Sequence, residues 1–116
     1  MVGHLSDDER IFAYRALCVA RNDTRPLPGF DEKEYVRFAS FDDRSLADLL
    51  EELRVVRAAS ISLFQSLSPE EWRRRGTANG YSATVRGLAF HMAEHERHHM
   101  RIVRDKYLAG IPVSYE

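Results

Sequence analysis

The sequence predicts an all-α domain, and three observations support this prediction. Apolar residues recur at helical spacing in three long segments, residues 3–21, 45–67 and 84–109. Capping or helix-breaking residues bound each segment. A length of 116 residues suits one hydrophobic core rather than two. We therefore expect residues 1–116 to form a single domain with three long helices, a short crossover helix and a short helical turn.

The composition argues against several functional classes. The formal net charge of −1 gives no electrostatic basis for binding nucleic acid or an anionic membrane. No apolar run approaches the roughly 20 residues of a membrane span. The single cysteine, Cys18, excludes an internal disulfide framework and suits a reducing cytoplasm, where we expect the protein to reside. Because Cys18 belongs to a helical apolar pattern, we interpret it as a small buried hydrophobe rather than a reactive thiol.

The first helix is expected over Gly3–Arg21. With His4 placed at 0° on a helical wheel, Asp8 lies at about 40° and Phe12 at about 80°. His4 therefore shares one face with an acidic residue one turn later and with apolar residues that face the core.

The connection that follows is long for a helical bundle. Pro26, Pro28 and Gly29 prevent the first helix from continuing through residues 22–30. A short helix over Asp31–Ala39 follows, with Asp31 as its N-cap. This length favours a crossover at the end of the bundle over a tight hairpin.

The second long helix is interpreted as scaffold. It starts at Asp43 or Ser45, runs to about Leu67, and carries no inward histidine or carboxylate. Its predicted inner stripe consists of Leu46, Leu49, Leu50, Leu53, Val56, Ser60, Leu63, Phe64 and Leu67.

Capping signals place the remaining elements. Ser68-Pro69-Glu70-Glu71 predicts the start of a short helix, because a capping serine precedes proline and two acids. Residues 76–82 are expected to form a loop. Ser82 or Thr84 then caps the final helix, which ends near Ala109 ahead of Gly110 and a proline.

The final helix carries four of the five histidines, His91, His95, His98 and His99. With His91 at 0°, His95 and His99 fall at about 40° and 80°, in the middle of the apolar stripe, and His98 falls at its edge. Two imidazoles four residues apart can coordinate one metal ion. The alternative is a pair of hydrogen-bonded core histidines. We favour the metal because the surrounding apolar side chains cannot satisfy two imidazoles.

Four stretches together resemble the DinB-like superfamily of metal-dependent four-helix bundles. They are GHLSDDERIFAYRAL, ARNDTRPLPGFDE, LADLLEELRVVRAA and TVRGLAFHMAEHERHHMRIVRDKYL. The resemblance implies a divalent transition metal (Zn, Ni, Fe or Mn) held by three histidines, which match His4, His95 and His99. Only three residues precede His4, so we expect the domain to lack the first helix of the family, or the natural protein to start further upstream.

The resemblance further implies a metal-dependent enzyme of thiol-transferase or hydrolase type. Its expected substrate is a low-molecular-weight thiol or another small molecule, and the resemblance does not specify its catalytic residues. Asp8, His91 and Glu96 are candidates to orient the metal ligands, and Asp8 or Glu96 to act as a general base. The alternative is a non-catalytic helical dimerisation module with a vestigial or structural histidine cluster.

The apolar pattern also predicts a homodimer. The final helix carries a second weak stripe, Phe90, Ala93, Met100 and Leu108. In a chain with three long helices, this stripe and the groove left by a missing helix have no cover. Pairing with a second copy about a two-fold axis is the simplest way to bury them.

Overall fold

The computed structural model describes residues 2–108, and side chains as far as His98. Its elements are α1 (Val2–Ala20), α2 (Glu32–Ala39), a 3₁₀ turn η1 (Phe41–Asp43), α3 (Leu46–Gln65), α4 (Pro69–Arg73), β1 (Arg75–Ala78), β2 (Tyr81–Thr84) and α5 (Val85–Leu108). The predicted all-α class is confirmed, with three long helices, a short crossover helix and a short helical turn. Within this described part, no helix is long and apolar enough to cross a membrane.

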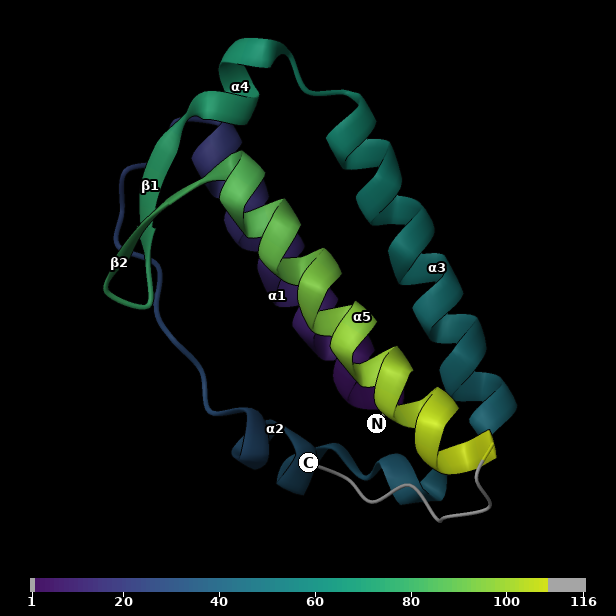
Figure 1. Ribbon diagram of the computed structural model, residues 1–116. Coiled ribbons are helices and arrows are strands. Elements are labelled where there is room, and N and C mark those ends of the chain that lie inside the picture. The colour runs from purple at the N-terminus through teal and green to yellow at the C-terminus, as the bar shows by residue number, and fades with distance from the viewer. Residues whose placement is uncertain (1, 109–116) are drawn as a thin grey trace.

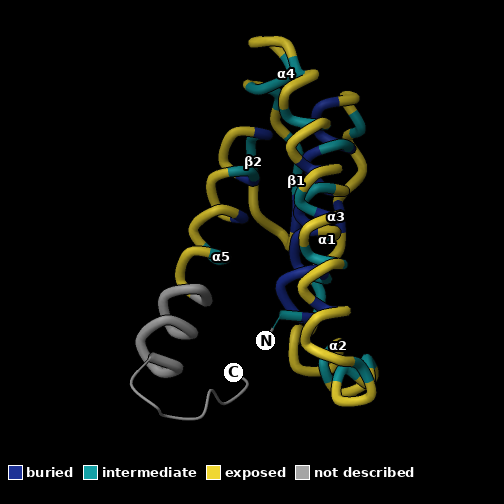
Figure 2. Tube along the Cα trace, turned by 90° about the vertical axis from the view of Figure 1, so that its right-hand side faces the viewer, coloured by how far each residue is buried: buried dark blue, intermediate teal, exposed yellow. Residues whose placement is uncertain are grey.

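Helix α1 is the centre of the fold. It packs against both α3 and α5, and α5 runs alongside it in Figure 1. Figure 2 shows that buried positions are concentrated in this part of the molecule, whereas α2 has no buried residue. The main core joins α1 to the first turns of α5: Phe12, Ala16, Val19, Ala20, Val85, Leu88 and Met92. Burial of these apolar side chains holds the two histidine-bearing helices together.

The predicted caps set the helix starts. Asp31 accepts hydrogen bonds from the backbone N–H groups of Lys33 and Glu34 and so begins α2. Ser45 caps α3 in the same way. At α4, Ser68 and Glu71 form a reciprocal capping box.

Residues 76–82, predicted to form a loop, instead make up most of a β-hairpin. Strands β1 and β2 pair antiparallel, with Ala78 opposite Tyr81. Asn79 and Gly80 both have positive φ angles, 52° and 79°, as the tight two-residue hairpin turn requires. The crossover segment, residues 21–31, connects α1 to α2. Its Leu27 forms a parallel bridge with Ala78, so the hairpin also anchors this segment.

The inner stripe expected on α3 is only partly buried. Leu49 and Val56 are buried, but Leu46 is 59% exposed and Leu50 48% exposed. The reason is that α3 packs mainly against α1, which leaves one side of the stripe uncovered.

Arg57 links all three long helices. From α3, its guanidinium donates to the carboxylate of Glu9 on α1, with Nε–Oε1 and Nη2–Oε1 distances of 2.9 and 2.5 Å. It also pairs with Glu96 on α5. Glu9 is only 3% exposed, so its charge depends on this partner.

We predict that Arg57→Met destabilises the fold by about 2 kcal/mol or more, because it leaves the Glu9 carboxylate buried without a cation. The matched control is Arg54→Met on the same helix. Arg54 pairs with Glu51 at the surface, and its side chain is 68% exposed. This control should change stability by less than about 0.5 kcal/mol. Urea unfolding measures the free energy of unfolding of both variants. If both substitutions changed it by the same small amount, Glu9 would not need Arg57.

Candidate metal centre

Four side chains from three helices converge near the start of α1. His4 and Asp8 lie one turn apart on α1, His95 lies on α5, and Glu32 is the first residue of α2. One ligand atom from each can be chosen so that all four lie within 4.8 Å of one another. These residues form what we call the His–Asp cluster.

The Asp8 carboxylate is the centre of this cluster. Its Oδ2 atom lies 3.1 Å from His4 Nε2 and 2.9 Å from His95 Nδ1. The two imidazole rings are nearly perpendicular, with centroids 5.6 Å apart. Glu32 is the more distant member, with Oε2 3.7 Å from His4 Nε2.

The cluster is closed on its inner side and open on its outer side. His4 is 2% exposed and Asp8 3% exposed, whereas the side chain of Glu32 is 47% exposed. A carboxylate and an imidazole are costly to remove from water unless charged or polar partners surround them. A buried pair next to an accessible carboxylate is therefore suited to a bound cation that a small molecule can approach.

The donor set can accept a divalent transition metal. Two imidazole nitrogens and carboxylate oxygens are ligands used by zinc, iron, nickel and manganese. Ligands at about 2.1 Å from one ion lie at most roughly 4.2 Å apart. The observed limit of 4.8 Å is close to that span, so shifts of a few tenths of an ångström would close the site around an ion.

The neighbouring carboxylates change the acid–base behaviour of His95. Its hydrogen bond to Asp8 raises the pKa of the imidazole above the usual 6.5, against the lowering effect of burial, and the charges of Asp8 and Glu32 raise it further. Without metal, the imidazolium of His95 therefore persists to higher pH than usual. A metal ion must displace this proton in order to bind.

Other predicted site residues lie around the cluster. His91 is exposed; its ring contacts Phe12 at a centroid distance of 4.9 Å and lies 6.4 Å from the His95 ring. Glu96 points to Arg57 on α3. The side chain of His99 lies outside the described residues, although its backbone continues α5 one turn beyond His95.

Sequence reasoning did not identify Glu32. This residue lies 28 positions after His4, on a short helix reached through an irregular connection, so no helical periodicity relates the two. The available signal was its place directly after the N-cap Asp31, which fixes the start of α2. Asp8, expected to orient ligands or to act as a base, lies in direct contact with both imidazoles.

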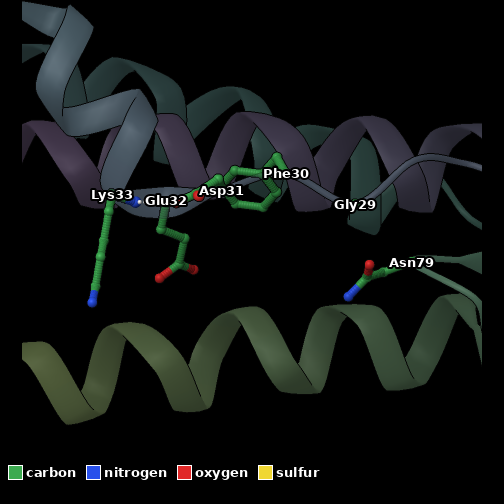
Figure 3. Close-up of a pocket in the computed structure, with 6 residues that line it drawn as sticks. All are labelled: Gly29, Phe30, Asp31, Glu32, Lys33 and Asn79. Carbon is green, nitrogen blue, oxygen red and sulfur yellow. Dashed lines mark hydrogen bonds between the residues drawn. The ribbon is translucent and has the colours of Figure 1, made fainter.

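A solvent cleft of about 590 Å³ reaches the cluster beside Glu32. Its lining comes from the crossover segment and the hairpin turn: Gly29, Phe30, Asp31, Glu32, Lys33 and Asn79. Figure 3 shows the side chains of Glu32, Lys33 and Asn79 extending into the space between this segment and α5. A small molecule in this cleft would meet the accessible side of the cluster.

Comparison with known proteins gives one result that covers most of the chain. A family model described as the DinB superfamily matches residues 1–103. No curated protein and no solved structure matches the chain. The matched range includes every member of the His–Asp cluster.

We predict that, in metal-free protein, His95 titrates above pH 6.5 and that Asp8→Asn lowers its pKa, since the mutation removes the largest cause of the shift. The folded-state pKa is raised, so protonated His95 stabilises the fold fully below about pH 6.5, and this stabilisation is lost as pH rises through the raised value. NMR titration of the imidazole Cε1 proton measures the pKa. Asp7→Asn is the control and should leave it unchanged; an unchanged value in Asp8→Asn would contradict the assignment.

Proposed function

Because this chain belongs to the DinB superfamily, we propose that it is a metalloenzyme that holds one divalent transition-metal ion at the His–Asp cluster. His4, Asp8 and His95 are the proposed ligands. The main supporting observation is the 3% exposed Asp8 carboxylate, which contacts imidazoles from two different helices. His99, one turn beyond His95 on α5, remains a ligand proposed from the sequence.

Each residue has a distinct proposed role. A bound ion would supply Lewis-acid activation of a thiol or a water near neutral pH. Asp8 would bind the ion together with the two imidazoles, and without the ion its carboxylate keeps both rings in place. Glu32, the most accessible carboxylate of the cluster, is the proposed general base that accepts the proton of the incoming thiol or water.

The proposed reaction is transfer to a thiol, or hydrolysis, with a small-molecule substrate. The cleft beside Glu32 supports this proposal because it is open to solvent and adjoins the proposed base. The ammonium of Lys33 and the carboxamide of Asn79, both in the cleft lining, can bind polar groups of the substrate.

We predict that purified protein retains about one equivalent of metal and that His4→Ala, Asp8→Ala and His95→Ala each abolish this binding. His91→Ala and His98→Ala, on the same helix as His95, are matched controls that should retain it. Elemental analysis after dialysis measures the metal content. Retention in Asp8→Ala together with loss in His98→Ala would contradict the proposed ligand set.

A thiol substrate can be tested with cobalt as a spectroscopic probe. We expect 2-mercaptoethanol to produce a thiolate-to-cobalt charge-transfer band in the cobalt-loaded protein, because a catalytic site keeps a coordination position open. Ethylene glycol should produce none. Glu32→Gln should retain cobalt but need higher pH for the band, since the proton acceptor is gone. Cobalt-loaded protein without the band would rule out the thiol reaction and leave hydrolysis.

We also propose that the chain forms a homodimer through the groove between α1 and α3. This groove, about 420 Å³ in volume, is lined mainly by apolar residues: Leu17, Val55, Val56, Ala59 and Leu63. Val55 in this lining is 52% exposed, so apolar surface remains for a partner to bury. A two-fold partner would cover this surface with its own equivalent.

Light scattering at micromolar concentration should give twice the 13.4 kDa mass of one chain. Val55→Glu should give monomers, because it places a charge in the apolar groove. Glu51→Gln, an exposed position on the same helix, should leave the dimer intact. A folded wild-type protein of 13.4 kDa would exclude the dimer.

A further inference from the structure

A second cavity lies between α1 and the crossover segment. Its volume is about 270 Å³, and it shares Gly29 and Phe30 with the cleft beside Glu32. Most of its wall is apolar or aromatic, from Ile11, Tyr14, Leu27, Pro28, Phe30 and Tyr35. Two arginines, Arg10 and Arg15, complete the lining.

The two arginines differ in their surroundings. Arg10 is exposed and forms an ion pair with Glu52 on α3. Arg15 is 6% exposed, and no Asp or Glu side chain among the described residues contacts it directly, although the charge of Asp8 acts on it from further away. Its Nη2 atom donates to the carbonyl of Pro28 at 2.9 Å, which leaves most of its N–H donors for another acceptor.

A buried guanidinium without a carboxylate in direct contact is an unusual feature. Burial lowers the pKa of Arg15, yet arginine keeps its proton throughout the physiological range. The rings of Phe12 and Phe30 lie 5.2 and 5.6 Å from its guanidinium carbon and offset part of the desolvation cost. An anion in the adjoining cavity would offset the rest of the desolvation cost of this guanidinium.

We propose that this cavity binds a small monocarboxylate with a flat apolar body. The planar fork of Arg15 matches a carboxylate, and a single unpaired guanidinium suits a single negative charge. The aromatic walls provided by Phe30 and Tyr35 suit a planar ring. The volume is slightly below the roughly 300 Å³ at which pockets for drug-sized molecules begin, so the ligand is about as large as one ring with its acid group.

This site is spatially distinct from the proposed metal centre. Arg15 lies two turns along α1 from Asp8, a rise of roughly 10 Å, and none of the cluster residues lines the cavity. The charge of Asp8 acts on Arg15 from a distance, but no metal ligand forms part of the cavity wall. Binding of a carboxylate is therefore expected with or without metal, and its failure would leave the metal proposal unaffected.

Calorimetric titration of the full chain with benzoate tests the proposal. We expect saturable binding with a Kd of about 1 mM and binding at least about tenfold weaker for benzamide, the neutral analogue. Arg15→Gln should weaken benzoate binding by at least about tenfold. Arg21→Gln is the matched control: Arg21 directly follows α1 and pairs with Glu71 at the surface, so this variant should bind as wild type does.

A second variant keeps the test decisive if Arg15→Gln does not fold. Ile11→Trp leaves Arg15 in place and fills the cavity from a partly exposed position on α1, and it should also abolish binding. Wild-type affinity for benzoate in either folded variant would overturn the proposal. Absence of saturable binding by the wild-type chain up to about 10 mM benzoate would overturn it as well.

Discussion

The Asp8 carboxylate, buried between two imidazoles, is the interaction on which the site depends. It lies in the interior because His4, one turn earlier on α1, and His95 on α5 surround it with polar atoms. Arg57 stabilises the same turns of α1 and α5. Its partners, Glu9 and Glu96, immediately follow Asp8 and His95 in the chain, so this ion-pair network fixes the two helices where the cluster forms. The apolar core further along α1 supplies the burial energy, and these polar contacts set the relative placement.

The crossover segment positions Glu32, which forms the solvent-accessible side of the proposed metal centre. Leu27 is hydrogen-bonded to the hairpin, and the carbonyl of Pro28 accepts from Arg15. Asp31 then caps α2 and directs the next residue, Glu32, toward His4. The crossover segment has little regular structure, but these contacts hold it at successive points. The backbone that carries the proposed base Glu32 therefore has a fixed position. The same fixed segment forms one wall of the carboxylate cavity beside Arg15.

Helical periodicity and capping residues were enough to predict the helices and to place His4, Asp8 and His95 on inward faces. These are local properties, because a wheel needs only the residues of one helix. Glu32 could not be found in this way, since its approach to His4 depends on the path of the intervening connection. The contact of Arg57 with Glu9 is equally non-local, so Arg57 had the pattern of an ordinary surface charge. The hairpin could have been predicted, because Asn79-Gly80 is the dipeptide favoured in a two-residue turn.

The most direct test of the metal centre is a crystal structure of the zinc-loaded chain with an anomalous difference map at the zinc edge. The account predicts one strong peak at about 2.0–2.2 Å from a ring nitrogen of His4, a ring nitrogen of His95 and a carboxylate oxygen of Asp8. A peak held only by His91 or His98 on the exposed face of α5, with Asp8 still enclosed by metal-free imidazoles, would contradict it.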